Sequence, residues 1–339
     1  MTRRQLITRT FTLLMLTAAG SVVDTASPLL AEETDLSLHD PSTLIKEGNA
    51  YWVFGTGRGC PAFSSTDRLR WTARGTVFPT LPVWTKEVVP GNTRGNLWAP
   101  DIRRFHGKYH LYYSVSTFGS NVSAIGLATS PTLDPPAWQD QGLVLRSEAH
   151  NDFNAIDPGI TLGPDGRIWL VFGSFWSGIK MIELNPATGK RLSPTSPLYA
   201  LAKHPQDRNN AIEAPFLYYH AGYYYLFVNW DYCCRGPKST YNIRVGRSAR
   251  VTGPYRDKEG VDLLQGGGSL LLGSVPDDGS GKPFDAKVGP GHAGILADNG
   301  IERFSFHYES VRDRGGKTQM EIRTVAWGHD GWPQILPEK

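Results

Sequence analysis

The sequence has few cysteines and no basic run beyond its N-terminus. Three cysteines among 339 residues are too few for a disulfide framework. The adjacent pair Cys233–Cys234 has no second thiol or histidine pair at zinc-ligand spacing, so it reads as two buried thiols or as a strained vicinal disulfide. Without a basic run, nucleic acid and anionic membranes are excluded as typical partners.

The only marked apolar run lies at the N-terminus, residues 11–23, and is too short to span a membrane in the mature protein. It follows a basic segment whose Arg3-Arg4 pair resembles a twin-arginine export signal. We therefore expect residues 1–31 to be removed and the protein to be periplasmic or extracellular. Residues 32–339 then form one domain, expected to be monomeric, with a net charge of about +1 that suits a neutral ligand.

Aromatic residues make up 11% of the chain, and 37 glycines and 24 prolines indicate many turns, a composition typical of an all-β protein. One pattern occurs five times: a polar or proline-containing segment, then an aromatic-rich strand, then a third strand. In some units a weaker fourth element follows. The aromatic-rich strands begin at residues 51, 109, 168, 223 and 304, the third strands at 61, 124, 179, 242 and 321, and fourth elements are expected at 71–78, 138–145 and 253–260.

Five such units of about sixty residues predict a five-bladed β-propeller. In this fold the innermost strands start near the central axis, so residues at those starts converge from different blades. The residues at comparable places are Asp40, Asp101, Asp157, Glu213 and His292. Asp101 follows a different local sequence and lies two residues past the position of Asp157, so we expect it to bond to the backbone.

Carboxylates held together cannot all ionise at their ordinary pKa values, and a pair with separated pKa values can act as general acid and general base. Hydrolysis of a glycosidic bond needs both roles. Aromatic rings such as Trp98 and Phe118 would offer faces to sugar rings, although either could instead belong to the core. His307 could also approach the axial pocket.

At this point a resemblance becomes specific. The ordered motifs "HDPS" at 39, "WAPDI" at 98, "NAIDPG" at 154, "IEAPF" at 212 and "GPGH" at 289 resemble glycoside hydrolase family 43, the five-bladed propeller glycosidases that include arabinanases. The resemblance covers essentially the whole mature chain. It implies an inverting hydrolase that cleaves internal α-1,5 linkages of arabinan, a neutral polysaccharide.

The resemblance also implies roles for individual residues. Asp40 matches the general base, Glu213 the general acid, and Asp157 the carboxylate that tunes and orients the acid. His292 matches a histidine that helps hold a hydrated calcium ion at the axis. The positions expected to line the sugar subsites are His39, Trp98, Phe118, Asn154, Ser174 and Phe175.

Other activities remain open on the same fold. An exo-acting arabinanase, an α-L-arabinofuranosidase or a β-xylosidase would share the acids and differ in the loops around 80–97 and 200–211. A non-catalytic sugar-binding propeller would be expected to lack one of the acids, and all three are present.

Overall fold

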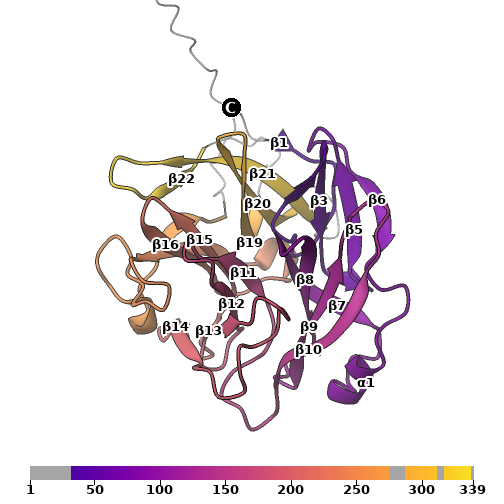
Figure 1. Cartoon of the computed structure of the whole chain (residues 1–339). Coiled ribbons are helices and arrows are strands. Elements are labelled where there is room, and N and C mark those ends of the chain that lie inside the picture. The colour runs from indigo at the N-terminus through magenta and orange to yellow at the C-terminus, as the bar shows by residue number, and fades with distance from the viewer. Residues whose placement is uncertain (1–31, 275–286, 311–316, 337–339) are drawn as a thin grey trace, which may run out of the picture.

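The computed structural model describes residues 32–274, 287–310 and 317–336. Its strands form five antiparallel sheets that follow one another around a ring, from indigo through magenta and orange to yellow (Figure 1). The five-bladed β-propeller is therefore confirmed. The expected export signal, 1–31, lies outside the described residues. Among those described, no helix has both the length and the apolar character needed to cross a membrane.

Each blade takes its strands in chain order, apart from the additions noted here. Blade 1 comprises β2 (Ile45–Glu47), β3 (Ala50–Phe54), β5 (Pro61–Ser65) and β6 (Thr72–Thr76). Blade 2 comprises β7 (Asn96–Phe105), β8 (Lys108–Val115), β9 (Ser123–Ser130) and β10 (Gln139–Ser147), with the short β4 (Gly57–Arg58) paired to β7. Blade 3 comprises β11 (Gly159–Leu162), β12 (Ile168–Phe172), β13 (Ile179–Leu184) and β14 (Tyr199–Ala202).

The last two blades complete the ring. Blade 4 comprises β15 (Ile212–His220), β16 (Tyr223–Trp230), β17 (Asn242–Ser248) and β18 (Ser269–Leu272). Blade 5 comprises β19 (Lys287–Asp298), β20 (Ile301–Ser310) and β21 (Thr318–Trp327), with β1 (Glu32–Glu33) and β22 (Pro333–Ile335) both paired to β21. The described helices are short: α1 (Trp84–Val88) and the 3-10 turns η1 (Gly236–Lys238) and η2 (Leu263–Gln265).

The second and third strands of every blade lie where the repeat predicts them, but the expected fourth strand of blade 4 at 253–260 is wrong. There only Arg256 pairs with a strand residue, Arg247 of β17, through two backbone hydrogen bonds of 2.8 and 2.9 Å. Asp257 then accepts the N–H of Val261 and closes a turn, so the chain leaves the sheet. The true edge strand, β18, follows it.

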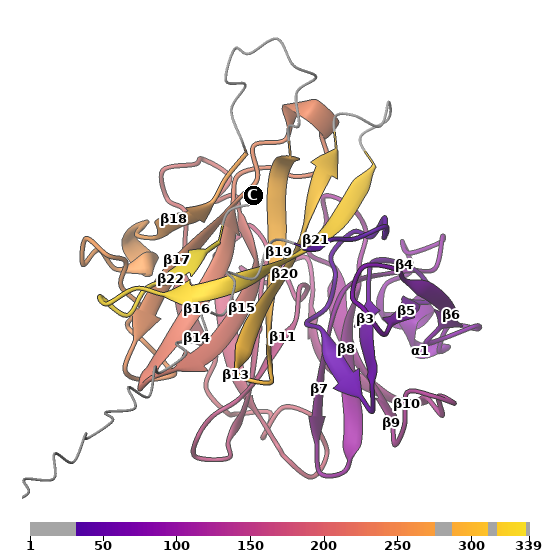
Figure 2. The ribbon, with the colours of Figure 1, turned by 90° about the horizontal axis from the view of Figure 1, so that it is seen from above.

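The ring is closed by pairing segments from both ends of the described chain. β1 runs antiparallel to β21, with Glu33 opposite Glu321, so the N-terminal segment adds a strand to the last blade (Figure 1). Seen from above, the yellow strands of blade 5 lie next to the indigo strands of blade 1 (Figure 2). Just beyond β1, the Met320 N–H donates to the Leu36 carbonyl at 3.0 Å. This pairing ties blade 1 to blade 5.

Buried apolar side chains of the described residues form five clusters, and each one lies between two neighbouring blades. Trp52 and Leu111 belong to the cluster of blades 1 and 2, whereas Phe227 and Phe304 belong to that of blades 4 and 5. The apolar area that stabilises the fold is thus buried between sheets. The inner strands are left to carry polar groups near the axis.

Candidate active site

Each inner strand, or the segment leading into it, contains one non-glycine residue in the left-handed conformation, which such residues seldom adopt. These bends are at Asp40, Ala99, Asp157, Ala214 and His292, with φ between 42° and 60°. Four of the five, all except His292, precede a proline and are 57–59 residues apart. Strained backbone of this kind persists where surrounding contacts fix it, and it is common at functional sites.

In every blade the N–H of the bend residue donates to a side chain of the preceding blade. The acceptors are His307 Nδ1 for Asp40, Thr56 Oγ1 for Ala99, Ser114 Oγ for Asp157, Asp157 Oδ2 for Ala214 and Asn229 Oδ1 for His292, at 2.8–3.1 Å. The result is a closed ring of hydrogen bonds around the axis. It holds the ionisable groups of separate blades in fixed positions.

The Asp40 carboxylate is surrounded by groups that favour its ionised form. Thr56 Oγ1 donates to Oδ2 at 2.6 Å, and ring nitrogens of His39, His292 and His307 lie 3.5–3.6 Å from Oδ1. Burial alone would raise the pKa of Asp40, but the three histidines and the threonine outweigh it and lower the pKa to about 2. Asp40 is therefore a carboxylate at neutral pH.

Glu213 and Asp157 show the opposite behaviour. Burial raises the pKa of Glu213, and the hydrogen bonds from Ser174, at 2.7 Å to Oε2, and from Tyr241 only partly offset it. Burial, followed by the charges of Glu213 and Asp40, raises the pKa of Asp157 well above its usual value. The site thus combines one carboxyl group whose pKa is lowered with two whose pKa values are raised.

Asp101 is buried close to this pocket but is committed to the backbone, as its sequence position predicts. Oδ1 accepts the N–H of Thr43 in blade 1 at 3.0 Å, and Oδ2 accepts the N–H of Ile160 in blade 3 at 2.8 Å. Its side chain therefore bridges the two blades that flank its own. This is a structural role.

The predicted subsite residues differ in how they are exposed. Phe118 is 91% exposed and His39, Trp98 and Phe175 are half-buried, so Phe118 is not a core residue. Asn154 is buried, and its Oδ1 has no hydrogen-bond partner among the described residues. Ser174 is also buried, and its hydroxyl donates to Glu213 at 2.7 Å.

Several site residues were missed or left open by the sequence. Thr56 and Tyr241 contact Asp40 and Glu213 from the ends of neighbouring strands, and neither was singled out. His307, which the sequence left open, is fully buried, and its ring stacks on that of His39 with centroids 4.4 Å apart. Thr56, Ser114, Ser174 and Asn229 all lie within two residues of the end of the aromatic-rich strand of their blade, a repeated polar position that could have revealed them.

His292, the predicted calcium ligand, lies at the axis with Nδ1 3.6 Å from Asp40 Oδ1. Burial lowers its pKa, which leaves a neutral imidazole whose lone pair can bind a metal. Calcium prefers six to eight oxygen ligands, and the neighbouring donors are one carboxylate and further imidazoles. These residues fit a calcium ion only if water supplies most of its ligands.

The cysteines fall into two groups. Cys60 is a buried free thiol. Cys233 and Cys234 are joined by a disulfide, Cys234 is exposed and Cys233 half-buried, so the alternative of two buried thiols is wrong.

Comparison with known proteins decides the family. The model of glycosyl hydrolases family 43 matches residues 34–333. The chain belongs to this family. It is 45% identical to the extracellular endo-α-(1→5)-L-arabinanase 1 of Bacillus subtilis, over 93% of the chain and 94% of that protein. It is 40% identical to an extracellular exo-α-(1→5)-L-arabinofuranosidase of Cellvibrio japonicus, over 88% of the chain and 86% of that protein.

Solved structures agree with this assignment. A family 43 endo-arabinanase from Bacillus licheniformis superimposes with a TM-score of 0.81 at 44% identity, covering 90% of this chain and all of that one. The native arabinanase of Bacillus subtilis gives 0.78 at 42% identity, covering 89% and 98%. The family assignment, the fold and the glycosidase class are therefore shared.

Proposed function

We propose that the protein is an exported, inverting endo-1,5-α-L-arabinanase that acts on arabinan. The observation that carries this proposal is the convergence of Asp40, Asp157 and Glu213 from three blades, with Thr56 Oγ1 2.6 Å from Asp40 Oδ2 and Ser174 Oγ 2.7 Å from Glu213 Oε2. The opposite pKa shifts of Asp40 and Glu213 support it. An ionised base beside a protonated acid is the state that a glycosidase needs before substrate binds. Arabinan and export follow from the relatives, of which the B. subtilis and C. japonicus proteins are named extracellular.

In this mechanism Asp40 accepts a proton from a water molecule as that water attacks the anomeric carbon. Glu213 gives its proton to the oxygen of the leaving sugar, and the new hydroxyl forms on the opposite face. Asp157 accepts the Ala214 N–H, which orients the segment next to Glu213, and its charge state adjusts the pKa of the acid. Inversion requires Asp40 and Glu213 to be about 6.5–9.5 Å apart, and this separation stays a prediction.

A calcium ion is part of the proposal. His292 would hold it, with Asp40 nearby, and its positive charge would help keep Asp40 ionised. The hydrogen bond from Thr56 already favours that ionised state. The ion is therefore expected to assist the base without being its only support.

The roles of acid and base can be separated with two substrates. We expect Glu213→Gln to lower kcat on linear arabinan by at least about a hundredfold. On an aryl arabinofuranoside with a good leaving group, the same variant should lose much less, because that bond needs little protonation. Asp40→Asn should lose activity on both, and Asp165→Asn, at an exposed hairpin carboxylate, is the matched control. Undiminished turnover of arabinan by Glu213→Gln would show that the acid is misassigned.

Exo action is the second candidate, because one relative at 40% identity is named as an exo-enzyme. Product analysis separates the two. Mixed oligosaccharides from linear arabinan indicate endo action, and a single small product indicates exo action. The anomeric configuration of the first product, followed by NMR, tests inversion in the same experiment.

A further inference from the structure

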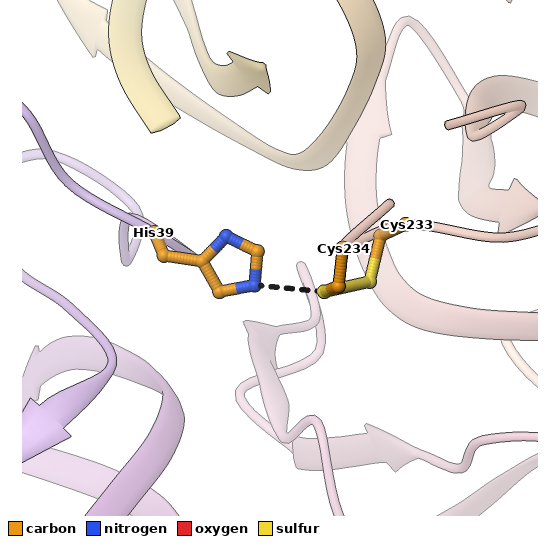
Figure 3. Close-up of side chains that lie close together, drawn as sticks. All are labelled: His39, Cys233 and Cys234. Carbon is orange, nitrogen blue, oxygen red and sulfur yellow. Dashed lines mark hydrogen bonds between the residues drawn. A yellow bond between two sulfur atoms is a disulfide. The ribbon is translucent and has the colours of Figure 1, made fainter. Parts of the chain in front are cut away.

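The disulfide between Cys233 and Cys234 lies at the candidate active site, one side chain away from Asp40. Cys234 Sγ is 3.6 Å from His39 Nε2, and the same nitrogen is 3.5 Å from Asp40 Oδ1 (Figure 3). The cysteines follow β16 in blade 4, whereas His39 and Asp40 lead into blade 1. The disulfide therefore reaches across the axial region to the side of the proposed base.

This disulfide does little to stabilise the fold. A disulfide stabilises mainly by restricting the unfolded chain, and the effect grows with the length of the loop that it closes. Between adjacent residues there is no intervening loop to restrict. The segment is also fixed without it, because buried Glu309 accepts the Cys234 N–H at 2.7 Å and the Ser239 hydroxyl at 2.5 Å.

Its exposure and chemistry point to a ligand. Cys234 is exposed and Cys233 is half-buried, so the pair is not packed into a core cluster. Cys234 also has a φ of 65°, a conformation that non-glycine residues seldom adopt and that is common at functional sites. A disulfide is apolar, polarisable and has no N–H or O–H donor, which matches the C–H face of a sugar ring.

We propose that the Cys233–Cys234 disulfide is a substrate-binding surface that contacts the C–H face of the arabinofuranose unit held beside Asp40. This inference rests on the proposed arabinanase function and adds a subsite contact to it. It has a redox consequence. A water-soluble phosphine would reduce the disulfide to two thiols and become a phosphine oxide, with water supplying the oxygen and both hydrogens. The two side chains could then rotate independently, and the rigid surface would be lost.

The test compares oxidised enzyme, phosphine-reduced enzyme and the Cys233→Ala/Cys234→Ala variant on linear arabino-oligosaccharides. We expect reduction and the double substitution each to raise KM about fivefold, corresponding to one lost apolar contact. The melting temperature should change by no more than about one degree. In the Glu213→Gln background, reduction should weaken binding of the same oligosaccharide by a similar factor.

The double variant is also the control for the reductant, since phosphine should leave its KM unchanged. A KM that is the same before and after reduction would overturn the inference. If the melting temperature also fell by several degrees, the disulfide would be a structural link instead. Failure of the oxidised wild-type enzyme to hydrolyse arabinan at all would instead count against the proposed function.

Discussion

Replacing Asp101 should destabilise the propeller while leaving the chemistry intact. In Asp101→Ala, the N–H groups of Thr43 and Ile160 lose the carboxylate that accepts them, and both are buried. An unpaired buried donor costs about 1–3 kcal/mol, so two cost about 4 kcal/mol together. For a domain of about 300 residues the entropy of unfolding is about 0.6 kcal/mol/K, and the expected fall in melting temperature is about 6 °C.

The assay combines thermal unfolding, followed by circular dichroism, with kcat/KM on linear arabinan at a temperature well below the transition. Asp101→Asn keeps one oxygen acceptor, so its melting temperature should fall less than that of Asp101→Ala. Both variants should keep kcat/KM within a few-fold of wild type. A hundredfold loss of kcat/KM in fully folded Asp101→Ala, or an unchanged melting temperature, would refute the structural role, because Asp101 would then act in the chemistry or carry no bridge.

Three further predictions concern the site itself. Ser174→Ala removes a hydrogen bond that lowers the pKa of Glu213, so this pKa should rise. The alkaline limb of the pH profile of kcat/KM should then move to higher pH. An alkaline limb that stays in place or moves to lower pH would contradict this prediction. Phe118→Ala should raise KM on arabinan roughly fivefold with an unchanged melting temperature, since the ring is 91% exposed; an unchanged KM would remove it from the subsites. Removal of metal by a chelator should lower turnover of arabinan, and added calcium should restore it in the wild type but not in His292→Ala. Metal analysis and turnover are measured on the same samples. An active enzyme without bound calcium would exclude a catalytic role for the ion.

The repeat in the sequence was enough to predict the blades but not the register of the inner strands. The repeat in the sequence predicts that Glu213 is equivalent to Asp40 and Asp157. In the structure the bend of blade 4 is at Ala214, one residue later, so Glu213 corresponds to His39 and Trp98. The sequence contained the signal, because Ala214 precedes proline just as Asp40, Ala99 and Asp157 do. The prolines, and not the carboxylates, therefore mark the equivalent positions of these four blades.

Other features depend on contacts between distant residues, which a repeat pattern does not report. Tyr241 reaches Glu213 from the start of the third strand of its own blade, and His39 meets Cys234 from nearly two hundred residues away. The disulfide was left open for the same reason, since adjacent cysteines say nothing about their surroundings. Local spacing predicts strands, whereas the identity of a carboxylate's partners is decided by how five separate blades meet.

The ring of bends also shows how blade 4, which carries Glu213, differs from the other four blades. In the other four blades the N–H of the bend residue donates to a polar residue of the preceding blade. That residue lies near the end of the second strand of its blade, and the four acceptors are His307, Thr56, Ser114 and Asn229. Ser174 holds that place in blade 3, yet it donates to Glu213, and Asp157 accepts the Ala214 N–H instead. Because of this change of partners, Glu213 accepts a hydrogen bond from a hydroxyl group, and the Asp157 carboxyl group contacts the strand that contains Glu213. The two carboxyl groups, whose charges influence each other, therefore both make their hydrogen bonds at the one described blade junction where the regular pattern is broken.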